Sequence, residues 1–153
     1  MPGTFSQIYI QIIFAVKGRG SLIYSDWEER LYQYITGIVR GKEQKMIAIN
    51  GMPDHIHICI GMKPSCCLSD LVREIKKASN EFINENKLSN FRFSWQEGYG
   101  AFSYSHSQID NVVKYIMNQK QHHRKVSFRE EYVDFLKKFE IEHDDKFLFE
   151  WVK

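Results

Sequence analysis

Four short segments of the chain are rich in β-branched, aromatic and other apolar residues, a pattern that predicts β-strands. The expected strands span residues 9–16, 45–50, 55–62 and 99–106. The second and third of these strands are joined by the sequence GMPD, in which Gly51 and Pro53 favour a turn. We therefore expect these two strands to form a hairpin.

Helical spacing of apolar residues and start signals mark four further segments. The expected helices span residues 25–40 and 69–86, and two more begin at Ser107 and Ser127. Three of them open with a sequence resembling a capping box, in which a serine is followed three residues later by an acidic residue. These pairs are Ser25 with Glu28, Ser107 with Asp110, and Ser127 with Glu130.

The predicted order is strand, helix, strand, strand, helix, strand, followed by helices. This is the split βαβ order of an α+β, ferredoxin-like (RRM-like) fold, with an antiparallel sheet and both crossover helices on one face. The opposite face is then expected to be open to a partner or a site. With 153 residues and no linker or repeat, we expect one domain over residues 1–153.

The composition excludes only a few classes of function. The formal net charge is +2, so any basic surface must come from local clustering. No signal peptide and no apolar run approaching roughly 20 residues is visible, which predicts a soluble cytoplasmic protein without a membrane partner. Three cysteines fit neither a disulfide framework nor a CxxC metal site, and Cys59 is expected to fill the core.

The stretch DHIHICI places two histidines on one predicted strand. Residues i and i+2 of a strand point to the same face, so His55 and His57 project together while Ile56 and Ile58 alternate with them. Two imidazoles placed in this way can bind one divalent metal. The alternative is a pair of half-buried surface histidines without a ligand.

The predicted helix after Ser107 carries a tyrosine and an amide one turn apart. At about 100° per residue, Tyr115 and Gln119 lie together on the flank of an apolar stripe. The amide oxygen suits a hard cation, and the phenol oxygen could act as a nucleophile. The alternative is that Tyr115 is a boundary residue with a solvated hydroxyl.

These motifs together resemble those of the HUH single-tyrosine transposases of the insertion-sequence 200/605 kind, including their REP-associated relatives. The resemblance runs from YIQIIFAVKGRG through MPDHIHICI, WQEGYGAFSYS, YIMNQ and QHHRKVSF to the final FLFEW, and so covers most of the chain. It implies that His55, His57 and Gln119 bind Mg²⁺ or Mn²⁺ and that Tyr115 attacks a DNA phosphodiester.

The same resemblance implies a reaction and its partners. The enzyme would cut and rejoin single-stranded DNA at hairpin-flanked element ends through a 5′-phosphotyrosine, leaving a 3′-OH and needing no ATP. The absence of a GxxxxGK[ST] loop agrees with that expectation. A homodimer is also implied, in which the tyrosine helix of one subunit often meets the histidines of the other.

Several basic residues are candidates for phosphate contacts. Arg73, Lys76 and Lys77 stand at i, i+3 and i+4 and form a basic stripe on the second predicted helix. Weaker candidates are Lys17, Arg19, Arg124 and Lys125. The aromatic residues Tyr99, Phe102 and Tyr104 could stack bases but alternate in the manner of core residues.

Three other histidines and one acidic residue are further possible members of the site. His122 and His123 are set aside as metal ligands, because histidine is common at helix ends. Asp54 and His106 are candidates for orienting a ligand through a hydrogen bond.

Two alternatives to the transposase remain open. One is a nucleic-acid-binding module, non-catalytic or adopted by the host, that uses the same fold with idle motif residues. The other is a small zinc hydrolase, which the lack of a third ligand at familiar zinc spacing disfavours.

Overall fold

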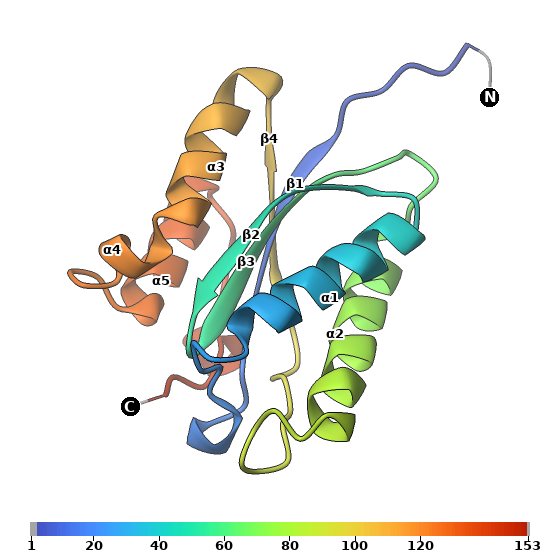
Figure 1. Ribbon diagram of the computed structural model, residues 1–153. Helices are drawn as coiled ribbons and strands as arrows, with labels where there is room; N and C mark the ends of the chain where they lie inside the picture. The colour runs from blue at the N-terminus through green and yellow to red at the C-terminus, as the bar shows by residue number, and fades with distance from the viewer. Residues whose placement is uncertain (1–2, 153) are drawn as a thin grey trace.

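The computed structural model describes residues 3–152 and contains one four-stranded sheet. Its strands are β1 (Tyr9–Ala15), β2 (Lys45–Met52), β3 (His55–Gly61) and β4 (Gly100–Tyr104). They lie in the order β2-β3-β1-β4, and every neighbouring pair is antiparallel. With a helix after β1 and another after β3, this order confirms the predicted α+β, ferredoxin-like fold (Figure 1).

Two crossover helices, α1 (Glu28–Gly41) and α2 (Leu68–Glu85), lie together on one face of the sheet (Figure 1). Their apolar stripes meet the side chains that β1 and β3 direct to this face. Ile12 of β1, Ile58 of β3 and Ile75 of α2 are completely buried there. Complete burial of such a side chain stabilises the fold by about 1.5–3 kcal/mol. This layer is the main core of the protein.

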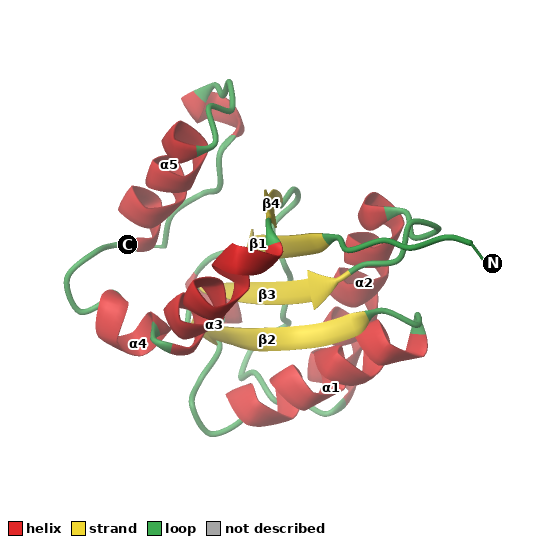
Figure 2. Cartoon of the chain, turned by 90° about the horizontal axis from the view of Figure 1, so that it is seen from above, coloured by secondary structure: helices red, strands yellow, loops and turns green. Residues whose placement is uncertain are grey.

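The opposite face carries α3 (Ile109–Met117), α4 (Gln119–His122) and α5 (Phe128–Lys138), as Figure 1 shows. The expectation of an open face was therefore wrong. Figure 2 shows α3 lying across β2 and β3. A small second core forms where Val112 and Ile116 meet Ala48 and Cys59, so Cys59 fills core as expected. The face is covered because these helices carry enough apolar surface to pack on it. The pattern within each helix shows an apolar stripe but not which surface buries that stripe.

Helix starts agree only partly with the predicted capping boxes. The box of Ser127 and Glu130 is present at α5. The box of Ser25 and Glu28 is not, because α1 begins at Glu28 after Trp27, without a side-chain cap, and the Glu28 carboxylate accepts from the Tyr32 hydroxyl.

The third predicted box is also displaced. It forms between Ser105 and Gln108 at a short 3-10 turn ahead of α3, rather than between Ser107 and Asp110. The helix expected from Ser107 is further divided at Asn118, which separates α3 from α4.

Helix α5 packs on the sheet through Phe135, whose ring centroid lies 5.0 Å from that of Phe102 on β4, and on the C-terminal segment through further aromatic rings. Tyr132 packs against Phe149, with 4.9 Å between ring centroids, and Phe128 packs against Trp151 at 5.4 Å. The segment after α5 is also tied to the loop before β4, because the Glu150 amide donates to Gln96 Oε1 over 2.7 Å. Within residues 3–152, no helix is both long and apolar enough to cross a bilayer.

Candidate active site

The two motif histidines lie on β3 and point to the face that α3 and α5 cover. Both His55 and His57 have no exposed surface, and their ring centroids are 5.1 Å apart. The His55 ring also stacks on Phe128 of α5 at 3.9 Å, nearly parallel. The reading of these residues as half-buried surface histidines therefore does not hold.

The hydrogen bonds of the two rings fix where their protons lie. Nδ1 of His55 is 2.7 Å from Asp54 Oδ1, and Nδ1 of His57 is 2.7 Å from Gln11 Oε1. Both partners are acceptors only, so each Nδ1 can donate to its partner, and each Nε2 faces the Glu131 carboxylate, where it offers a lone pair whenever it carries no proton. Histidines that bind metals usually have this arrangement. Asp54 thus has the orienting contact expected of it, whereas His106 contacts the Tyr9 hydroxyl instead.

The structure brings Gln119 and Tyr115 to the same place. Gln119 is completely buried, and its Oε1 lies 3.2 Å from Nε2 of His55. The Tyr115 ring stands edge-on to the His57 ring, with 5.9 Å between centroids, and its hydroxyl donates to the Glu131 carboxylate. All four residues that the sequence suggested for the chemistry therefore meet within one chain.

Two residues at this centre had no predicted role. Glu131 of α5 is almost completely buried, and its Oε1 lies 3.3 Å from Nε2 of His55, 3.0 Å from that of His57 and 3.1 Å from that of His123. One donor atom from each of these four residues lies within 4.8 Å of all the others. His123, which the sequence analysis set aside as a helix-end residue, therefore lies at this centre. A signal for Glu131 was present, since it falls at a core position of the α5 apolar stripe.

The charges at the centre follow from burial and these contacts. Burial would raise the pKa of Glu131, but the contacts with His123, His55 and His57 outweigh it and hold this pKa far below its usual range. Burial lowers the pKa of His57 to about 4, so this ring is neutral near pH 7. Burial would also lower the pKa of His55, but its contacts with Asp54 and Glu131 raise it. The centre is thus a buried anion surrounded by imidazoles.

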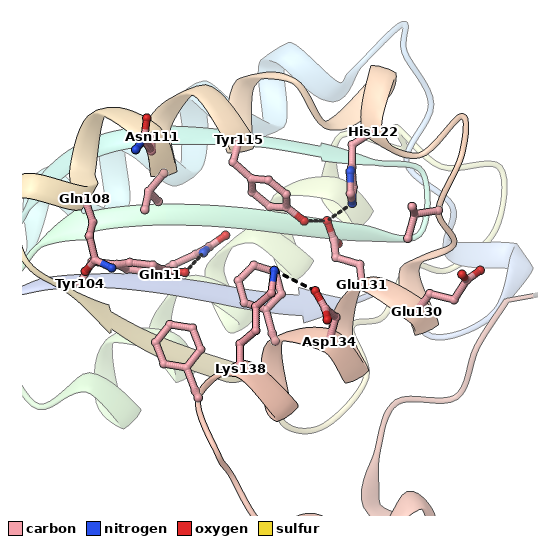
Figure 3. Close-up of a pocket in the computed structure, with 14 residues that line it drawn as sticks. Gln11, Tyr104, Gln108, Asn111, Tyr115, His122, Glu130, Glu131, Asp134 and Lys138 are labelled. Carbon is pink, nitrogen blue, oxygen red and sulfur yellow. Dashed lines mark hydrogen bonds and ion pairs between the residues drawn. The ribbon is translucent and has the colours of Figure 1, made fainter.

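Tyr115 separates two hollows on the surface. The larger, about 790 Å³, is lined by Tyr115 and Glu131 and by the aromatic rings of Tyr104 and Phe135. Figure 3 shows the Tyr115 hydroxyl directed at Glu131. The smaller, about 570 Å³, is lined by polar side chains that include Lys125. A strand of nucleic acid can therefore approach the phenol along the surface without entering the core.

The predicted phosphate-binding residues fall in two places. Arg73 and Lys76 are on α2, on the far side of the sheet from Tyr115 (Figure 1). Arg73 pairs with Asp70 at 2.8 Å, and the Lys76 ammonium group donates to two backbone carbonyls, one of them that of Gly98 at 2.9 Å. Burial also lowers the pKa of Lys76.

The other five candidates are all exposed: Lys17, Arg19, Lys77, Arg124 and Lys125. Of the whole set, only Lys125 lines a hollow beside the tyrosine.

A ferredoxin-like sheet with a histidine pair on a central strand, facing a helical tyrosine and glutamine, defines a tyrosine transposase of the HUH class. The sequence model described as "Transposase IS200 like" matches residues 4–119, which include both histidines, Tyr115 and Gln119. The chain belongs to this IS200-like transposase family. Helix α5, with Glu131, follows the matched region.

Individual relatives agree with this assignment. The ISDra2 transposase TnpA of Deinococcus radiodurans is 24% identical over 122 residues, which cover 76% of this chain and 87% of that protein. A crystal structure described as a transposase from the same organism has a TM-score of 0.61 and 21% identity, over 78% of this chain and 95% of the other. A REP-associated tyrosine transposase bound to a REP hairpin has a TM-score of 0.59 and 20% identity, over 78% and 70%. These two structures share the fold.

Proposed function

We propose that this transposase cuts and rejoins single-stranded DNA at hairpin-flanked element ends, with Tyr115 as the nucleophile. The observation that carries the proposal is the meeting of Tyr115 with His57, Glu131 and Gln119 in one buried centre. His55, His57 and Gln119 would hold Mg²⁺ or Mn²⁺. The lone pairs of the two imidazoles and the amide oxygen already converge there, which fits a bound cation.

The Tyr115 phenol needs help to react. Burial and the Glu131 carboxylate raise its pKa far above 10, so almost none is ionised near pH 7. A divalent ion, when bound, polarises the scissile phosphate and offsets the negative charge of the attacking oxygen. His55, His57 and Gln119 would hold that ion, and the contact between the Tyr115 and His57 rings keeps the phenol beside them.

The proposed chemistry is a reversible exchange of phosphodiesters. The Tyr115 hydroxyl loses its proton, its oxygen forms a bond to phosphorus, and the bond from phosphorus to O3′ breaks. The departing oxygen takes up a proton to become a 3′-OH, so no net proton is released. The 5′-phosphate then remains on the tyrosine. Attack by a 3′-OH on this bond restores a phosphodiester and releases the phenol, so strand joining needs no ATP.

DNA contacts are proposed on two surfaces. Lys125 and Arg124 lie at the end of the tyrosine-bearing segment, where they can neutralise phosphates next to the scissile one. The α2 stripe, with Lys17 and Arg19, would hold the duplex stem of a hairpin. Lys76 reaches a phosphate only by giving up its two carbonyl contacts, so Arg73 and Lys77 are the stronger candidates there.

We propose a homodimer as the working form. The described chain places Tyr115 beside its own His57, so each subunit has both halves of the chemistry without exchanging the tyrosine helix. In this arrangement the second subunit serves to hold the second DNA end near the first.

The test is covalent trapping of DNA. The protein is incubated with labelled single-stranded hairpins and Mg²⁺ or Mn²⁺, and adducts are resolved by denaturing gel and located by mass spectrometry. We expect a metal-dependent adduct on Tyr115, its loss in Tyr115→Phe with DNA binding unchanged, and its retention in the control Tyr24→Phe, which alters an exposed tyrosine. An adduct that persists in Tyr115→Phe would refute the nucleophile. Metal-independent binding without any adduct would favour the non-catalytic module.

A further inference from the structure

His123 presents its ring to the centre in the same way as the two motif histidines. Its Nδ1 lies 2.7 Å from the carbonyl oxygen of Val126, which can only accept, so Nδ1 carries the proton. Its Nε2 faces Gln119 Oε1 at 3.0 Å and Glu131 Oε1 at 3.1 Å, and offers them a lone pair when it carries no proton. A third imidazole is therefore oriented by a hydrogen bond from outside the centre.

Gln119 is oriented too. Its Nε2 donates to Glu131 Oε2 over 3.2 Å, which turns the amide oxygen toward the imidazoles. The centre thus gathers three ring nitrogens, one carboxylate oxygen and one amide oxygen, all directed inward. Such a cluster needs positive charge between its atoms, which either protons on the imidazole Nε2 atoms or a metal ion that replaces those protons can supply.

The spacing of the donor atoms suits a metal ion. Donors held about 2.1 Å from a cation lie roughly 3.0–3.4 Å from their neighbours in tetrahedral or octahedral geometry. The five contacts from His55, His57 and His123 to the oxygens of Glu131 and Gln119 range from 3.0 to 3.3 Å. The site therefore needs only small adjustments to bind a cation.

We propose that His123 and Glu131 are metal ligands, and that with His55, His57 and Gln119 they form a centre that binds first-row transition cations in preference to Mg²⁺. The inference rests on the proposed function and extends it. Three imidazoles are a donor set that Mg²⁺ accepts poorly, because it prefers oxygen ligands and retains water, whereas Mn²⁺ and Zn²⁺ accept mixed nitrogen and oxygen donors.

This assignment gives α5 a part in the chemistry. Glu131 binds the cation through Oε1, while its Oε2 receives the hydrogen bond of the Tyr115 hydroxyl. One carboxylate therefore sets the position of the nucleophile relative to the metal. Both new ligands follow residue 119, where the family match ends, so the matched region alone does not contain the whole centre.

The experiment measures metal binding to the full chain in the absence of DNA. Mn²⁺ is titrated into metal-free protein by calorimetry and by loss of the free-ion EPR signal, and Mg²⁺ is then added as a competitor. Wild-type protein should bind one Mn²⁺ per chain, and a 10-fold excess of Mg²⁺ should not displace it. Loss of an orienting contact alone weakens metal binding by about 10- to 100-fold, so Glu131→Gln and His123→Gln should weaken it by about 100-fold or more.

The matched control is Glu130→Gln. Glu130 is exposed, and glutamine preserves its capping box with Ser127, so Mn²⁺ binding should stay at the wild-type level. Circular dichroism establishes that each variant is folded, and His123→Gln provides an independent test should Glu131→Gln unfold.

Wild-type Mn²⁺ affinity in folded Glu131→Gln or His123→Gln, together with loss in His55→Gln, would overturn the new ligands and leave the proposed function standing. Unchanged affinity in His55→Gln as well would refute the metal centre of the proposed function itself. Ready displacement of Mn²⁺ by Mg²⁺ would refute the proposed preference.

Discussion

Gly100 of β4 lies directly against Tyr132 of α5, and replacing it tests how α5 is positioned. A Cβ atom at this position would lie 2.6 Å from the Tyr132 hydroxyl oxygen and 2.9 Å from Cε1 of the same ring. Heavy atoms in contact settle at about 3.5–4.0 Å, so Gly100→Ala must separate the two elements by roughly 0.5–1 Å. Tyr132 is buried against Phe149 and cannot simply turn away. Overpacking of this kind costs about 1–3 kcal/mol of unfolding free energy.

The displacement should also reach the proposed metal centre. Glu131 precedes Tyr132 on α5, and its contacts with the imidazoles are 3.0–3.3 Å long, so a shift of half an ångström lengthens each of them markedly. Sites that must be held within about 0.5 Å lose function under such shifts. We therefore expect Mn²⁺ affinity to fall by about 10-fold in Gly100→Ala, although the substitution touches none of the ligands.

The assay combines urea unfolding with Mn²⁺ calorimetry. Tyr132→Phe removes the closest atom, so in the Gly100→Ala background it should restore part of both losses, with a coupling energy of roughly 0.5–3 kcal/mol. The control Gly37→Ala lies on an exposed part of α1 with nothing within 4 Å and should stabilise the protein by about 0.5–1 kcal/mol. Wild-type stability and metal affinity in Gly100→Ala would refute the view that close packing of Tyr132 on Gly100 positions α5.

Two further predictions concern the ring under the metal centre and the groove beside Tyr115. Phe128→Ala removes the ring that stacks on His55 and should lower the unfolding free energy by about 3–5 kcal/mol. Phe128→Leu should lower it by less than about 1.5 kcal/mol. Equal losses of the two variants in urea titrations would contradict a packing role. Lys125→Ala should reduce the slope of log affinity for single-stranded DNA against log salt by about 0.7, and Lys42→Ala, next to α1, should leave it unchanged. A wild-type slope for Lys125→Ala would remove that residue from the DNA contacts.

The fold could be predicted because each strand and helix has a clear local pattern. The strands match to within a few residues, and their order with the crossover helices determined the sheet topology. Helix starts were harder, because a capping box requires a backbone geometry that a short motif does not guarantee. At α1 the chain makes a turn from Tyr24 to Glu28, and the Glu28 carboxylate is used by Tyr32 and Lys120 instead.

The candidate site could be predicted in part. The period of a strand places His55 and His57 on one face, and the period of a helix places Tyr115 near Gln119. Local geometry thus gave two pairs, and the family resemblance assigned them to one site. Glu131 did not, because it reaches the histidines only through the packing of α5 across the sheet, a contact over 74 positions. Such contacts depend on tertiary packing. A buried carboxylate within an apolar stripe was the one local sign of it.

The wide spacing of the donors along the chain has a consequence for the timing of activity during synthesis. Ribosomes add about 5–20 residues per second, so roughly 4–15 s separate the making of His57 from that of Glu131. The contact between Gln96 and Glu150, which ties the segment after α5 to the rest, comes later still. During translation the nascent chain has its histidine pair but not its carboxylate. A nascent chain that ends before Glu131 therefore lacks part of the proposed centre, and the proposed DNA cleavage has to wait for α5 to be made and packed.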